Sequence, residues 1–170
     1  DLIPLIGVFN NLGRAHLELG NLEQAKWYLE ESLDLGNKLG NPVRHLLTTK
    51  VYLGNIYICK TQFLNAFITF QEAFETADLG YSGKVLKCSY AWLLTLLGDT
   101  KSAEEVINDV LETFPDYLHA LFLLVLVKHQ QGKLELVDYT RVNQHYLQKP
   151  NSLVKPLYMW MKSLALPFPE

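Results

Sequence analysis

The sequence predicts an all-α protein in which antiparallel helix pairs repeat along the chain to form an α-solenoid. Apolar residues recur at every third or fourth position through most of the 170 residues, which is the period of amphipathic helices rather than strands. Turn residues interrupt these runs at positions 20, 61, 98 and 132, so the intervals are 41, 37 and 34 residues. Small residues also return in the same phase within successive runs. Repetition of this kind indicates a stack of similar units.

The first repeat, residues 2–41, carries the pattern most completely. A Gly-Asn turn separates its two apolar runs, which predicts two helices joined by a short connection. Asn21 is expected to cap the second helix, with Gln24 three residues later completing a capping box. Gly36 and Gly40 are its expected stops, because glycine readily takes the left-handed conformation of a helix C-terminus.

Gly13 and Ala25 of this repeat are interpreted as packing residues. Two antiparallel helices can approach closely where a small residue of one lies against a bulky residue of the other. The second repeat places Gly54 and Ala66 in the corresponding positions, with Gly54 following Gly13 by 41 residues. The two repeats are therefore expected to pack alike.

Three further repeats follow with decreasing regularity, over residues 42–80, 82–115 and 116–150. Thr61 is expected to cap the second helix of repeat two. The stretch 151–166 predicts one more helix, which either covers the exposed apolar face of the last pair or begins a further repeat. Because the chain starts with Asp and not Met, we expect a fragment of a longer protein that forms one helical repeat domain over residues 1–170.

These repeats resemble the tetratricopeptide repeat, in which an aromatic residue, Leu-Gly and Tyr precede Ala and Phe. The first repeat carries Phe9, Leu12-Gly13 and Ala25 at those places, with His16 for Tyr and Leu29 for Phe. Its long joint resembles the ~40-residue variants of kinesin light chains, Leu-Gly-Asn-repeat G-protein regulators and bacterial maltose-regulon activators. The resemblance implies a right-handed α-solenoid whose first helices line a concave groove.

The same resemblance assigns candidate groove residues by position. They are Asn10, Asn11, Arg14, Thr48, Tyr52, Asn55, Ser89, Trp92 and His119. Asparagine amides can pair with a peptide backbone, arginine can bind a carboxylate through two hydrogen bonds, and aromatic rings offer contact area. The alternative is that the asparagines lie on solvated helix faces and that Trp92 belongs to the core.

Composition and charge exclude several classes of function. A net charge of −3 and a pI of about 6.0 give no basic footprint for nucleic acid or for an anionic membrane surface. The longest apolar run, residues 118–127, is too short to span a bilayer and predicts a buried helix. The two cysteines, Cys59 and Cys88, are expected to be free and largely buried thiols of a cytoplasmic protein.

No catalytic, cofactor-binding or metal-binding constellation is recognisable in the sequence. The sequence therefore predicts a non-catalytic scaffold or adaptor domain that binds a peptide or a helix of another protein. The alternative is a regulatory, sensor or oligomerisation domain of a bacterial transcription activator or signalling protein. Its high apolar content motivates that alternative, because a second copy could cover exposed apolar area.

Overall fold

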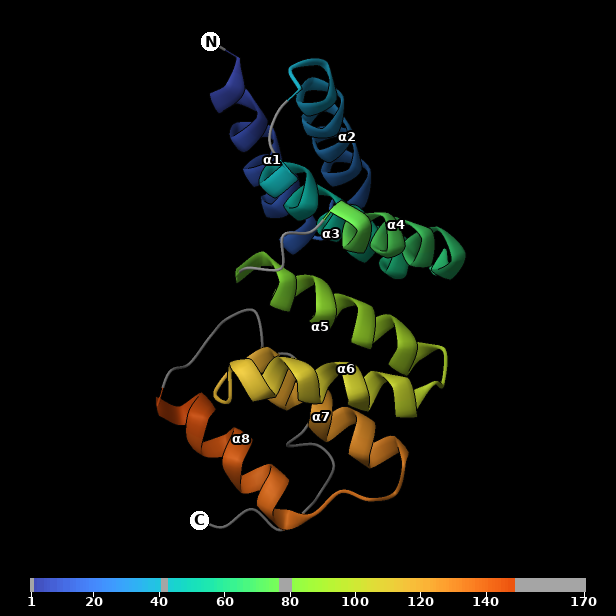
Figure 1. Ribbon diagram of the computed structural model, residues 1–170, viewed down its shortest axis with the longest axis vertical. Helices are drawn as coiled ribbons and strands as arrows, with labels where there is room; N and C mark the ends of the chain where they lie inside the picture. Colours follow the sequence, from blue (N-terminus) through green and yellow to red (C-terminus); the bar gives the residue numbers. More distant parts are fainter. Residues whose placement is uncertain (1, 41–42, 77–80, 149–170) are drawn as a thin grey trace. The chain divides into compact units, whose positions relative to one another are not determined.

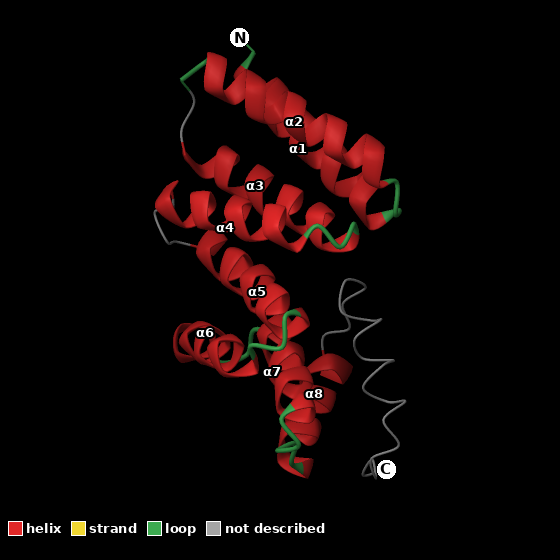
Figure 2. Ribbon diagram, turned by 90° about the vertical axis from the view of Figure 1, so that its right-hand side faces the viewer, coloured by secondary structure: helices red, strands yellow, loops and turns green. Residues whose placement is uncertain are grey.

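The computed structural model describes residues 2–40, 43–76 and 81–148, and in these ranges it contains helices and no strand (Figure 2). The chain divides into two compact units, Asp1–Leu93 and Leu94–Glu170, which are called the N-terminal and the C-terminal unit below. The helices, labelled in Figure 1, are α1 (Ile3–Glu18), α2 (Leu22–Lys38), α3 (Val43–Cys59), α4 (Phe63–Thr76), α5 (Tyr81–Leu96), α6 (Thr100–Thr113), α7 (Leu118–Gln130) and α8 (Leu136–Gln148). The predicted all-α class and the packing of helices in pairs, as in a helical-repeat solenoid, are confirmed.

The first helix pair, α1 and α2, packs closely at the glycine that the sequence singled out. A Cβ atom added to Gly13 would lie 2.5 Å from Cγ of Leu29 and 3.3 Å from the carbonyl oxygen of Ala25. Leu29 and Ala25 are both fully buried. The absence of a side chain at Gly13 therefore sets how near the two helices lie.

The second pair, α3 and α4, uses the same device with a larger side chain. The ring of Phe70 fills the space beside Gly54, where an added Cβ would lie 2.3 Å from Cε1 of the ring. Phe70 belongs to an apolar cluster that joins three helices of the N-terminal unit. Its buried members are Leu47, Val51 and Ile58 of α3, Ala66, Phe70 and Ala73 of α4, and Leu86 and Leu93 of α5.

The first and second pairs are held together by a second apolar cluster and by a buried polar contact. Ala25 and Leu29 of α2 pack with Leu53 and Ile56 of α3. Ser32 of α2 donates a hydrogen bond of 3.1 Å to the carbonyl oxygen of Ile6 in α1, and its Oγ lies 3.4 Å from Oγ1 of Thr49 in α3. A buried hydroxyl needs such partners, so Ser32 links three helices at one point.

The C-terminal unit is built around α7, the apolar helix expected from residues 118–127. Leu121, Phe122 and Val125 of α7 pack with Val142 and Tyr146 of α8 in one buried cluster. Lys128 pairs with Asp138 across the same two helices at 2.7 Å. Gln131 ties the end of α7 to α6 by donating to the carbonyl oxygen of Thr100 and to Oε2 of Glu104.

The four turn positions recognised by their spacing share one backbone conformation. Gly20, Gly98 and Gly132 have φ values of +78°, +83° and +68°, and Thr61 has a φ of +56°. Thr61 is therefore not the cap of α4, as the sequence predicted, but the residue that takes the left-handed step after α3. Its hydroxyl donates to the carbonyl oxygen of Lys60 at 2.7 Å. A β-branched residue is strained in this region.

Replacing Thr61 with glycine is expected to stabilise the N-terminal unit by about 0.5–1 kcal/mol. Relief of left-handed strain, about 1–2 kcal/mol, exceeds the added flexibility of the unfolded chain. Urea denaturation followed by circular dichroism measures the change. Gly20→Ala is the matched control, since it introduces the same strain at the equivalent turn and should lower stability by a similar amount. Loss of stability in Thr61→Gly would contradict the assignment.

Two other local expectations differ from the structure. Gly36 does not end α2, which continues to Lys38. Its missing side chain instead makes room for Leu46 of α3, whose Cδ2 atom lies 2.8 Å from where a Cβ atom of residue 36 would stand. Asn21 is at the N-cap position of α2 but makes no capping hydrogen bond, so the capping box with Gln24 is not formed. The Nδ2 atom of Asn21 lies 3.4 Å from Nδ1 of His16 instead.

The two cysteines lie in different surroundings, one buried and one exposed. Cys88 is buried, and burial raises the pKa of its thiol to about 12. Cys59 is free but exposed, so the expectation that both thiols are buried is wrong for Cys59, which lies in the last turn of α3. The predicted helix at 151–166 falls outside the described residues.

Candidate binding face

Two of the predicted groove residues meet where α1 and α3 lie side by side. Burial raises the pKa of Tyr52, and the positive charge of Arg14 and a hydrogen bond from it oppose that rise. The two side chains are therefore neighbours, although they are 38 positions apart in the sequence. Arg14 also lies 3.9 Å from Glu18 on its own helix, where both side chains are about half exposed. Its guanidinium remains accessible to a ligand.

Asn10 stands one helical turn before Arg14 and is buried, with only 7% of its surface exposed. Its side-chain Oδ1 atom has no hydrogen-bond partner among the described residues. A buried acceptor without a partner costs free energy of about 1–3 kcal/mol. Asn10 is therefore not on a solvated helix face, and its side-chain oxygen receives no hydrogen bond from the described residues.

The α3 candidates share one side of their helix. Thr48, Tyr52 and Asn55 follow each other at spacings of four and three, so they lie in a row, and all three are partly exposed. With Asn10 and Arg14 of α1 they form what we call the polar face of the N-terminal unit. This face consists of amide, hydroxyl and guanidinium groups on two adjacent helices.

The remaining candidates lie elsewhere or contribute less surface. Ser89 of α5 is buried, and Trp92 packs partly buried against the apolar cluster of α3, α4 and α5. Asn11 is exposed on α1. His119 belongs to the C-terminal unit, where burial lowers the pKa of its imidazole and its ring lies 6.3 Å from that of Tyr117.

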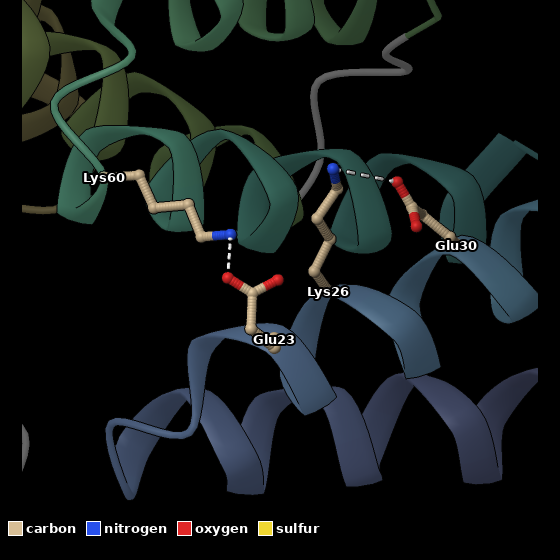
Figure 3. A network of polar contacts seen from close by, with 4 residues as sticks. All are labelled: Glu23, Lys26, Glu30 and Lys60. Atoms are coloured by element: carbon tan, nitrogen blue, oxygen red, sulfur yellow. Dashed lines mark hydrogen bonds and ion pairs between the residues drawn. The ribbon is translucent and has the colours of Figure 1, made fainter.

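An ion-pair network at the interface of the first two helix pairs was not recognised from the sequence. Figure 3 shows Lys60, the residue after α3, reaching Glu23 of α2, and Lys26 pairing with Glu30; the two N–O distances are 2.5 Å and 3.5 Å. The hydrogen bond and charge of Lys60 hold the pKa of Glu23 below its ordinary value. Lys26 also stands 5.6 Å from the centre of the Tyr57 ring. Glu23 and Lys60 have no local sequence pattern that could predict their pairing.

The described residues, 2–40, 43–76 and 81–148, hold neither a metal-ion cluster nor a membrane-spanning helix. No group of three or more His, Cys, Asp or Glu side chains in these ranges is arranged to hold a metal ion. No helix in the same part of the chain is long and apolar enough to cross a membrane.

Residues 6–36 match the family model described as Tetratricopeptide repeat. The chain carries a tetratricopeptide repeat. The matched range covers most of α1 and α2, including the close contact at Gly13 and two residues of the polar face, Asn10 and Arg14. No curated protein matches the chain. Tetratricopeptide repeats mediate protein–protein interactions, so the repeat indicates an interaction scaffold with a protein partner.

Proposed function

We propose that this protein is a non-catalytic adaptor domain that binds an extended peptide, or a helix of a partner protein, on the polar face of α1 and α3. The tetratricopeptide repeat at residues 6–36 supports a protein partner. The observation that carries the location is the buried, unpaired Oδ1 atom of Asn10 beside the accessible guanidinium of Arg14. A buried acceptor of this kind is a place where a ligand can supply the missing donor.

The chemistry of the polar face suits a peptide. Asn10 Oδ1 accepts a backbone N–H, which recovers the free energy lost by the unpaired oxygen. Arg14 binds a carboxylate of the peptide through two hydrogen bonds. Asn55 can donate to or accept from the peptide backbone, and the Tyr52 ring offers contact area next to Arg14. Affinity would therefore fall when either α1 or α3 loses these groups.

The double variant Arg14→Glu, Asn55→Ala is expected to weaken peptide binding at least about tenfold. Charge reversal at Arg14 repels a carboxylate, and Asn55→Ala removes a backbone contact. The probe is a set of peptides selected on the native chain from a phage-displayed random library, with affinity measured by fluorescence anisotropy. Lys101→Glu, an exposed charge reversal on α6, is the control and should leave affinity unchanged.

Asn10→Leu separates a binding role from a structural one. Leucine has a similar size and no acceptor, so the free energy of unfolding should stay constant or rise by about 1 kcal/mol, while peptide affinity falls. If Asn10 served the fold, the same substitution would lower stability. Unchanged affinity in both the double variant and Asn10→Leu, with native circular dichroism, would remove the polar face as the binding site.

The alternative from the sequence was a regulatory, sensor or oligomerisation domain of a bacterial activator or signalling protein. Its oligomerisation part rests on the high apolar content of the sequence. The transcriptional part draws no support from the described residues. A cytoplasmic location belongs to the proposal as well, and the unpaired thiols of Cys59 and Cys88 are consistent with a reducing compartment.

A further inference from the structure

The repeat positions that form the polar face on α3 occur once more on α5. The interval between repeats two and three is 37 residues, and adding it to Thr48, Tyr52 and Asn55 leads to three positions of α5. These are Val85, Ser89 and Trp92, and we call them the α5 row. Their spacings of four and three place them on one side of the helix. All three precede the end of the N-terminal unit at residue 93, so they belong to the same unit as the polar face.

Helix α3 lies between α1 and α5. It packs beside α1, and it shares with α5 the buried cluster that contains Leu47 and Leu86. Val85 and Trp92 pack against this cluster and are only partly buried, so each keeps part of its surface open. Neighbouring packed helices lie about 8–10 Å apart, which places the α5 row about 16–20 Å from α1.

The chemistry of this surface changes from charged to apolar in the direction from α1 to α5. Arg14 on α1 offers a half-exposed guanidinium. The equivalent position on α3 is the amide Asn55, and on α5 it is the indole of Trp92. Because Ser89 is only 4% exposed, Val85 and Trp92 supply the open surface of the α5 row. A ligand that spans the three helices therefore meets a cation at one end and an apolar site at the other.

Charged residues are divided between the first and the second helices of the repeats. Helices α1, α3 and α5 contain five basic residues and one acidic residue, Glu18, whereas α2 and α4 contain six acidic residues and two basic ones. The five basic residues are Arg14, Arg44, Lys50, Lys84 and Lys87. The helices that carry the polar face and the α5 row thus have the opposite sign to the whole chain, whose net charge is −3. This separation of charge favours an acidic ligand.

The ion pairs already present on these helices leave Arg14 as the contact for a ligand carboxylate. Lys50 pairs with Glu72 of α4 at 3.3 Å, so much of its charge is balanced within the second repeat. Glu18 lies 3.9 Å from Arg14, but both side chains are about half exposed, and such a pair contributes little free energy. A carboxylate that binds the guanidinium through two hydrogen bonds can therefore take the place of Glu18.

We propose that the partner of this protein is an acidic peptide segment with an apolar anchor. A carboxylate of the segment binds Arg14, and an aromatic or large aliphatic side chain about five residues away packs against Val85 and Trp92. An extended chain advances about 3.3–3.6 Å per residue, so about five residues cover the distance between the two contacts. Between them the backbone passes Asn55, whose amide can pair with it. This inference rests on the proposed function, since it specifies the partner of the same face.

Four labelled peptides with capped ends test this partner class by fluorescence anisotropy. The first carries Asp-Glu and Leu-Phe separated by four Gly and Ser residues, and it is made in both chain directions. The second has Lys-Lys for Asp-Glu, the third has Ser-Ser for Leu-Phe, and the fourth has a spacer of one residue. Each of these three changes should weaken binding at least about tenfold, because it removes one contact or prevents both from forming together.

Variants of the protein assign each end of the peptide to its contact. Arg14→Glu should exchange the preference, so that the Lys-Lys peptide binds better than the Asp-Glu peptide. Trp92→Leu should weaken the first peptide about tenfold and leave the third, which lacks the anchor, unchanged. That difference separates a lost contact from a disturbed fold, because a disturbed fold would weaken both peptides. Ile68→Ala, at a 47% exposed apolar position of α4, is the control and should bind all four peptides like the native chain.

The outcomes distinguish a wrong partner class from a wrong binding face. Equal affinity of the native chain for the first peptide and for the second or third overturns the proposal. Absence of binding by the first peptide in both directions at about 1 mM also overturns it. If the phage-selected peptides still lose affinity in the double variant Arg14→Glu, Asn55→Ala, the adaptor function stands and only the partner class is wrong. If they do not, the proposed function fails as well.

Discussion

Replacing Phe70 with alanine is expected to lower the free energy of unfolding of the N-terminal unit by about 3–5 kcal/mol. Phe70 is fully buried and belongs to the cluster that joins α3, α4 and α5. Its ring also meets Tyr90 of α5 edge to face at 6.4 Å. Truncation removes the buried ring and leaves a cavity that the glycine at position 54 cannot fill, since Gly54 has no side chain to move into it.

Urea denaturation followed by far-ultraviolet circular dichroism and by tryptophan fluorescence measures this loss. Two of the three tryptophans, Trp27 and Trp92, lie in the N-terminal unit that holds Phe70, and Trp160→Phe in every variant confines the emission to these two. Phe67→Ala is the matched control on the same helix. Phe67 is 37% exposed and should cost clearly less than Phe70→Ala. Equal losses for the two variants would show that Phe70 does not hold the three helices together.

Gly54→Ala is expected to destabilise the same unit by about 1–3 kcal/mol, even though alanine favours helices. The new Cβ would lie 2.3 Å from Cε1 and 2.6 Å from Cζ of Phe70. Because Phe70 is enclosed by buried neighbours, its ring cannot turn aside, and α3 and α4 must separate or shift. The same change in an open helical position has the opposite sign.

Gly7→Ala provides that opposite case. Gly7 lies within α1 and an added Cβ there meets nothing within 4 Å, so alanine should stabilise the helix by about 0.5–1 kcal/mol. Denaturation of both variants under identical conditions compares them directly. Phe70→Leu, which is smaller at the clashing edge, should reduce the cost of Gly54→Ala in a double-mutant cycle. A stabilising Gly54→Ala, or additive effects of the two substitutions, would exclude the close contact.

Helix pairing was predictable from the sequence because it depends on short spacings. Gly13 with Ala25 and Gly54 with Ala66 recur in phase, and each glycine does lie against a bulky buried side chain of the partner helix. The equivalence of Thr61 to the turn glycines was predictable from position alone. Its role was not, because threonine is common at helix caps and rare at positive φ. Position in the repeat outweighed the preference of the residue.

The candidate site was predictable only as a set of positions. Family resemblance named Asn10, Arg14 and Tyr52, but their relation depends on how α3 packs beside α1, which local spacing does not contain. The burial of Asn10 and the contact of Arg14 with Tyr52 follow from that packing. The pair formed by Glu23 and Lys60 also arises there, between residues 37 positions apart.

The sequence by itself determined the all-α class, the antiparallel pairs, the turn positions and the tetratricopeptide repeat, since each follows from apolar period and small residues within about 40 positions. Tertiary structure decided which faces remain available. Stacking of the second pair on the first buries Asn10 with an unpaired oxygen and brings Arg14 to Tyr52. It leaves Leu5, Val8 and Leu12 of α1 exposed. Burial depends on neighbours distant in the chain, so the apolar period that predicts a helix cannot say which of its faces is covered.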